Sequence, residues 1–301
     1  MRERVRENYT TTLGLAAVVT AAMFCGLGKA QSQLVSGASA FEAASIRRAQ
    51  PGGRPRMEGG PGTSDPGRIH YSNISLRYLV MAAYRVDTFQ LSAPAWLETN
   101  AFEISATLPP GTTGVQLHQM LQKLLVERFH LVLHHEQRIM PTYTLVVGKS
   151  GPKLKDSEQV NADVAEDFDP LPPGPPNELE LDHEGYPIVP PGEGSWVVAL
   201  RSGRARTHQL NASMPDLAAL LSRQLGRPVK DATGLKGRYD FTLSWTAAIT
   251  VPGAELRAQA ADIGPDLLSA VQQQLGLRLE TSKSPVEVLV IDNVERDPLG
   301  N

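Results

Sequence analysis

Apolar residues recur at helical spacing after one serine in each half of the chain. The positions are Leu76, Leu79, Val80 and Ala83 after Ser75, and Met214, Leu217, Leu220 and Leu221 after Ser213. This spacing places them on one face of a helix. Because a serine hydroxyl can accept a free amide of the first helical turn, each serine is predicted as an N-cap. Asp216 forms a capping-box variant with Ser213, and Gly226 predicts where the second helix ends.

Strands and a further helix follow in each half. Residues 102–106 (FEISA) and 239–243 (YDFTL) alternate apolar and polar side chains, which predicts strands with one buried face. The next helices are predicted at 115–129 and 265–275. Further strands are predicted at 41–46, 131–133 and 141–147 in the first half, and at 196–200, 277–279 and 285–291 in the second.

These landmarks recur in one order, which predicts an internal duplication. The matched positions are Gly67-Arg68 with Gly203-Arg204, Ser75 with Ser213, Phe102 with Tyr239, Phe129 with Leu275, and Pro141 with Pro285. Their separation changes by one step of several residues, which an insertion near Ile249 explains. We therefore predict an α+β fold, a tandem repeat of two small two-layer α/β sandwich modules, each approximately β-α-β-β-α-β-β.

An acidic, proline-rich segment separates the two halves. From Asp156 to Glu184 there are ten acidic residues and no lysine or arginine, and prolines crowd its second half. Since like charges repel and proline lacks a backbone donor, such a segment packs poorly. The predicted organisation is a first module at 31–155, a linker at 156–192 and a second module at 193–301.

The N-terminus has the three parts of a secretory signal peptide. Arg2, Arg4 and Arg6 precede an apolar run at 13–27, and Gly28-Lys29-Ala30 offers small residues for cleavage after residue 30. A membrane span needs roughly 20 apolar residues, so an uncleaved anchor is the alternative rather than the first reading. The expected location is therefore secreted or periplasmic, with membrane attachment only if residues 1–30 are retained.

Cysteine content and charge exclude several function classes. The single cysteine, Cys25, lies in the apolar run, and Met23 and Phe24 before it are large for a lipoprotein signal. The mature chain would have no disulfide, thiol nucleophile or thiolate metal site. The formal charge of −3 on 301 residues provides no positive field for nucleic acid.

Several segments resemble one family of uncharacterised secreted proteins that is abundant in soil acidobacteria. They are FEAASI, SLRYLVMAAY, LLVERFHL, PTYTLVV with GPKLK after it, DATGLKGRYDFTLSW and PVEVLVIDNVE. The resemblance spans nearly the whole mature chain. Where FEAASIRR stands, the family more often has a Val and a Lys-Pro. It implies a domain of unknown function with no assigned activity. The element order also resembles the short N-terminal domain of secretins and TonB-dependent transporters, which binds other envelope proteins, an analogy of fold alone.

Histidines are the only candidates for enzymatic chemistry. His130, His134, His135 and Glu136 lie close in sequence, and His118 and His70 could approach them in space. Imidazoles with a carboxylate suit zinc, and His130 and His134 would share a face of one strand. Against a metal site, a duplicated unit should repeat it, and the second half has Gly276, Glu280 and Thr281 there. Exposed histidines on an edge strand are the competing interpretation.

No catalytic motif is present, so a non-catalytic binding module without a cofactor is predicted. Its expected partner is an envelope protein or a cell-wall polymer, bound at open sheet edges or helix faces. Two linked copies would raise avidity or form one composite surface. The alternatives are an envelope metal-dependent hydrolase using the histidines above, and a small-molecule carrier with an apolar pocket.

Overall fold

The computed structural model describes residues 40–158 apart from 51 and 54, 181–186, 188, 196–199, 203–246 and 264–300. The predicted signal peptide at 1–30 and Cys25 lie outside the described residues. So do most of the predicted linker and the insertion near Ile249. Within the described part, no helix is long and apolar enough to cross a membrane.

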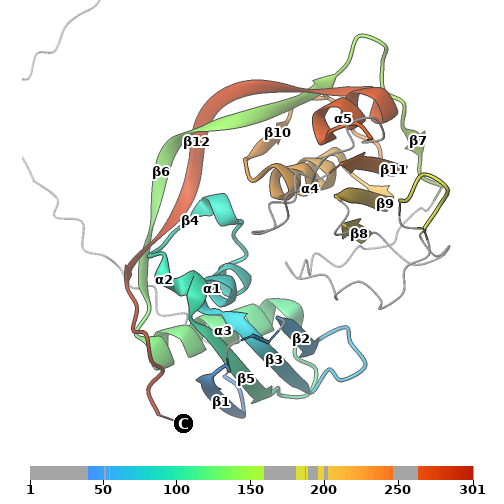
Figure 1. Cartoon of the computed structure of the whole chain (residues 1–301). Coiled ribbons are helices and arrows are strands. Elements are labelled where there is room, and N and C mark those ends of the chain that lie inside the picture. Colours follow the sequence, from blue (N-terminus) through green and yellow to red (C-terminus); the bar gives the residue numbers. More distant parts are fainter. Residues whose placement is uncertain are drawn as a thin grey trace, which may run out of the picture. The chain divides into compact units, whose positions relative to one another are not determined.

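The first sheet has four antiparallel strands in the order β1-β5-β3-β2. Its strands are β1 (Ala43–Arg48), β2 (Arg56–Gly59), β3 (Arg68–Ser75) and β5 (Ala101–Thr107). Helices α1 (Leu76–Tyr84) and α3 (Gly114–Phe129) lie on one side of this sheet (Figure 1). The core between them includes Phe102 and Phe129, whose rings meet edge to face at 5.0 Å. The other side of the sheet carries polar side chains.

The predicted helix starts in this half are confirmed. Ser75 caps α1 by accepting the amide of Tyr78, and Thr113 and Gln116 form a capping box at α3. The strand β3 before α1 was not predicted, because only short alternation (Ile69, Tyr71) marks its buried face. Between α1 and β5 the chain forms η1 (Thr88–Gln90), β4 (Leu91–Ser92) and α2 (Trp96–Thr99).

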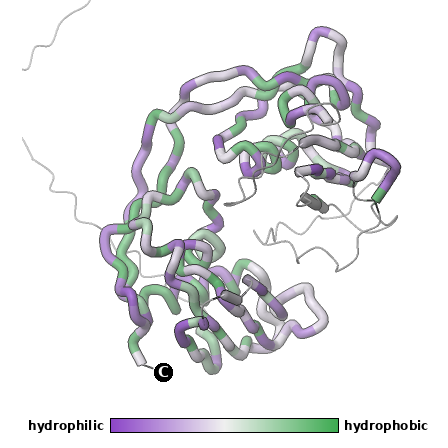
Figure 2. The backbone as a smooth tube through the Cα atoms, viewed as in Figure 1, coloured by the Kyte–Doolittle hydropathy of each residue, from purple (hydrophilic) through white to green (hydrophobic). Residues whose placement is uncertain are grey.

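A second four-stranded sheet has the order β7-β11-β9-β8. Its strands are β7 (Lys155–Asp156), β8 (Trp196–Ala199), β9 (Arg204–Ala212) and β11 (Tyr239–Thr246), and its helices are α4 (Met214–Leu225) and α5 (Leu267–Leu275). The prediction for α4 is confirmed, with a capping box at Ser213 and a left-handed Gly226 at its end. Apolar residues recur along α4 (Figure 2), and Leu217 and Leu221 lie in the core.

A third sheet contains the two longest strands, β6 (Val132–Val147) and β12 (Leu277–Asn293), paired antiparallel over nearly their full length. The prediction of two separate strands in each of these segments was wrong. Pro141 and Pro285, the predicted starts of the second strands, each lie inside a continuous strand. Each proline lies where its strand has a neighbour on one side only, and an edge strand tolerates proline.

Each half of the chain also supplies a short strand to the other half's long strand. β4 runs parallel to β12, with Leu91 opposite Leu289. β10 (Val229–Asp231) runs parallel to β6, with Val229 opposite Tyr143. The two halves therefore share the sheet β10-β6-β12-β4. Helices and strands mixed in this way confirm the predicted α+β class.

Candidate functional site

The four residues predicted as metal ligands do not converge. His130 is the C-cap of α3, in left-handed conformation, and is not on a strand as the sequence suggested. Its Nδ1 lies 2.8 Å from Oε1 of Glu295. His134 and His135 are neighbours on β6, and successive strand residues point to opposite faces.

Each of these side chains has a partner of its own on or beside the long strands. Nδ1 of His134 lies 2.9 Å from the carboxylate of Asp292, and Nδ1 of His135 lies 3.0 Å from Glu287. The guanidinium of Arg138 donates a hydrogen bond to Glu136, which lowers the pKa of that carboxyl. Among the residues that the structure describes, no group of three His, Cys, Asp or Glu side chains is arranged to hold a metal ion.

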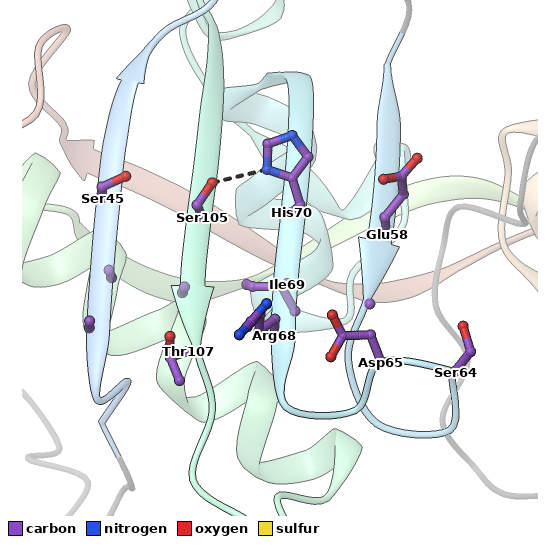
Figure 3. Close-up of a pocket in the computed structure, with 13 residues that line it drawn as sticks. Ser45, Glu58, Ser64, Asp65, Arg68, Ile69, His70, Ser105 and Thr107 are labelled. Carbon is purple, nitrogen blue, oxygen red and sulfur yellow. Dashed lines mark hydrogen bonds between the residues drawn. The ribbon is translucent and has the colours of Figure 1, made fainter.

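A polar row crosses the exposed face of the first sheet instead. Backbone register places Ser45, Ser105, His70 and Glu58 side by side on its four strands. Nδ1 of His70 lies 2.9 Å from Oγ of Ser105, and its Nε2 lies 3.0 Å from Oγ of Ser72. Ser45, Glu58, His70 and Ser105 line an open cavity of about 890 Å³ (Figure 3). We call this exposed side of the first sheet, with the cavity and the residues that line it, the first face.

This row lacks the arrangement of a nucleophilic triad. A catalytic histidine needs an orienting carboxylate on one nitrogen and the nucleophile on the other. In the first face both nitrogens of His70 meet hydroxyl groups, and the carboxylate of Glu58 lies 3.3 Å from Arg56. Among the described residues, no carboxylate therefore orients His70 toward a serine of this row.

The polar side of the second sheet carries an arginine, a histidine and hydroxyl groups in a similar arrangement. His208 on β9 lies opposite Thr242 on β11, and its Nδ1 lies 3.0 Å from the Thr242 hydroxyl. Arg206, two residues before His208, donates from Nε to Oγ of Ser244 at 2.8 Å. In the first face Arg68 is likewise two residues before His70, opposite Thr107. We call the second arrangement the second face.

A segment of the chain itself binds to the second face. Arg206 donates from Nη2 to Oδ2 of Asp182 at 2.6 Å. The Tyr186 ring is 4% exposed and lies 5.2 Å from the guanidinium of Arg204 and 5.1 Å from that of Arg206. Asp182 also accepts the backbone amides of Glu184 and Tyr186, both at 3.0 Å, which closes a tight turn. We call residues 182–186 the docked turn.

The charge of the docked turn is held in place by its neighbours. Burial alone would raise the pKa of Asp182. Hydrogen bonds from the Tyr186 amide and the Arg206 guanidinium outweigh that effect, so the pKa of Asp182 lies below its usual value. The carboxylate therefore stays ionised and remains paired with Arg206. The docked turn lies within the predicted linker, of which this part has a defined contact.

A family model described as "Protein of unknown function (DUF3738)" matches residues 77–294, from the first turn of α1 to just after β12. The chain belongs to this family. The expectation of a domain of unknown function is thereby confirmed. Neither the curated proteins nor the solved structures contain a significant match to this chain.

The sequence of this DUF3738 member held one signal for the two faces. The triplets RIH (residues 68–70) and RTH (residues 206–208) place an arginine two residues before a histidine. The match of Gly67-Arg68 to Gly203-Arg204 pairs Arg68 with Arg204 and so misses this signal. In the structure Arg68 corresponds to Arg206, because Arg68 lies opposite Thr107 and Arg206 lies opposite Ser244. Of the predicted histidines, only His70 lies in this constellation, while His118 lies on α3.

Proposed function

We propose that this chain is a non-catalytic, secreted or periplasmic binding protein that holds a segment of another protein on its first face. The observation that supports this proposal is the docked turn. A sheet surface of the same residue types already holds a short peptide segment through an ion pair and a buried aromatic ring. The first face carries its own arginine, histidine and hydroxyl groups around an open cavity.

The proposal includes a tandem repeat of two related two-layer modules. Support comes from positions that recur at one spacing: Arg68 with Arg206, His70 with His208, and Ser75 with Ser213. Asn73 and Asn211 also share a left-handed backbone, with φ of 53° and 52°, beside an irregularity in strand pairing. The reciprocal pairing of β4 with β12 and β10 with β6 agrees with an exchange between two similar units.

The proposed location rests on the N-terminal segment, and the proposed partner class rests on the docked turn. The arginines and apolar run of residues 1–30 support export. An exported protein meets envelope proteins and cell-wall polymers, and we propose an envelope protein because the docked turn is itself a peptide. The hydrolase and carrier alternatives are not favoured, since the predicted ligands do not converge and the cavity is open rather than enclosed.

A peptide-display selection on the full chain tests this function. Peptides selected on the wild type are compared on Ser105→Tyr, which places a ring in the middle of the first face, and on Ser105→Ala, which leaves the cavity open. Tyrosine suits an exposed strand position, so the fold should persist. We expect selected peptides to lose binding to Ser105→Tyr, whereas Ser105→Ala, which removes one hydroxyl group and adds no bulk, should weaken it only slightly. Peptides that bind all three proteins equally, or no selected peptide at all, would refute the first face as the binding site.

A further inference from the structure

We infer that the ligand of the first face is an acidic turn followed by an aromatic residue, with Arg68 binding its carboxylate. This inference rests on the proposed function and specifies the chemistry of the partner. The inference is based on the second face, where Asp182 of the docked turn accepts a hydrogen bond from Arg206 and the Tyr186 ring contacts its guanidinium. The argument depends on how far the surroundings of Arg68 match those of Arg206.

In the second face, a hydroxyl group on the neighbouring strand orients the arginine. The Nε of Arg206 donates to Ser244, which leaves Nη2 directed at the ligand carboxylate. Its side chain is only 17% exposed beneath the docked turn. A charged pair shielded in this way is stronger than one in open water. The docked turn thus shows what ligand chemistry this arrangement selects.

In the first face, Arg68 occupies the corresponding place without such a cover. It lies opposite Thr107, as Arg206 lies opposite Ser244, and its side chain is exposed. Figure 3 shows its guanidinium between Thr107 and Asp65. Within the described part of the chain, Arg68 makes no ion pair within 4 Å. Small residues (Ala43, Ala44, Ala106 and Gly59) line the cavity around it and leave room for a turn.

Two differences between the first face and the second face define the expected chemistry of the ligand more closely. Arg204, which lies on one side of the Tyr186 ring, has Pro66 at its position in the first half, so an aromatic ring there would contact one guanidinium instead of two. Glu58 and Asp65 also line the first face and repel additional negative charge. The best ligand therefore has one well-placed carboxylate beside an aromatic ring, rather than a long acidic run.

The chain provides a defined probe for this chemistry. A fluorescent peptide of residues 181–188 (LDHEGYPI) is titrated into the full chain and followed by anisotropy. The variants are Arg68→Ala in the protein, Asp182→Asn in the peptide, and Lys123→Ala as a control that removes a charge from α3 on the opposite side of the sheet. We expect Arg68→Ala and the altered peptide each to weaken binding by about tenfold or more, as for a lost charged hydrogen bond. Lys123→Ala should leave binding unchanged.

Distinct results would overturn the inference. Unchanged affinity of the peptide for Arg68→Ala would remove Arg68 as the anchor. Displayed peptides that lose binding to Ser105→Tyr but contain no carboxylate would overturn the acidic ligand and leave the proposed function standing. If no displayed peptide depends on the first face, the function itself fails. Self-association of the protein that Arg68→Ala abolishes would identify the occupant as a second copy and overturn a separate partner.

Discussion

The contact between Arg206 and Asp182 gives the sharpest quantitative prediction. Their N–O distance is 2.6 Å, and the two side chains are 17% and 21% exposed, so solvent screens them less than an ordinary surface pair. A hydrogen bond between charged groups contributes about 1.5–3 kcal/mol. Arg206→Ala also removes the contact with the Tyr186 ring, which adds about 0.5–2 kcal/mol. Asp182→Ala in turn removes the acceptor of the Glu184 and Tyr186 amides, so we expect each variant to destabilise docking of the turn by more than the pair alone contributes.

A double-mutant cycle isolates the pair. Urea unfolding of the wild type, Arg206→Ala, Asp182→Ala and the double variant should give a coupling free energy of about 1.5–3 kcal/mol. Hydrogen exchange at the amides of Glu184 and Tyr186, which donate to Asp182, follows the docked turn directly. Both amides should lose protection in either single variant. A coupling below about 0.5 kcal/mol, with those amides unchanged, would refute the docked turn as a specific contact.

Further predictions concern the pH dependence of stability, a core residue, a helix cap and metal binding. Since the pKa of Asp182 is lowered in the fold, its ionised carboxylate stabilises the protein above the unfolded pKa, and this stabilisation is lost as pH falls below about 4. The free energies of unfolding of wild type and Asp182→Asn, compared at pH 3 and pH 6, test this. Phe129→Ala should cost about 3–5 kcal/mol in chemical denaturation, because this ring is fully buried against Phe102. Ser213→Ala should cost about 1 kcal/mol through the lost cap of α4, and Ser213→Thr, which keeps the hydroxyl group, should retain most of that stabilisation. Zinc and a chelator should give the same Tm, and a rise of several degrees with zinc alone would restore a metal site.

Local chemistry made parts of the fold predictable from sequence. The caps at Ser75 and Ser213 depend on residues three positions apart, so each signal and its outcome lie in one short window. The continuity of β6 was not predicted, because it depends on pairing with β12, which follows β6 by more than a hundred residues and lies opposite Pro141. Sequence periodicity reports only on residues that are close together in the chain, so it cannot indicate a partner strand at this distance.

The candidate site was harder still. His70 becomes significant only once β3 places it beside Ser105, and the polar side of β3 has no hydrophobic signature. The docked turn joins Asp182 to Arg206 through a contact that neither periodicity nor composition encodes. Its acidic, proline-rich surroundings favoured a solvated linker, and that average description hid one carboxylate with a specific partner.

The exchange of short strands between the halves has a consequence for the order in which the protein forms. All four strands of the first sheet, and helices α1 and α3, lie before residue 130, so this sheet can pair while the rest of the chain is still being synthesised, and Leu289 of β12 completes its core later. β6 must then wait for β12, whose last residue is Asn293, and among the described strands only the short β10 can pair with it before then. Such distant pairing slows folding and leaves a strand exposed to other chains. Folding of this protein therefore favours conditions that protect an unpaired strand until its C-terminal partner arrives.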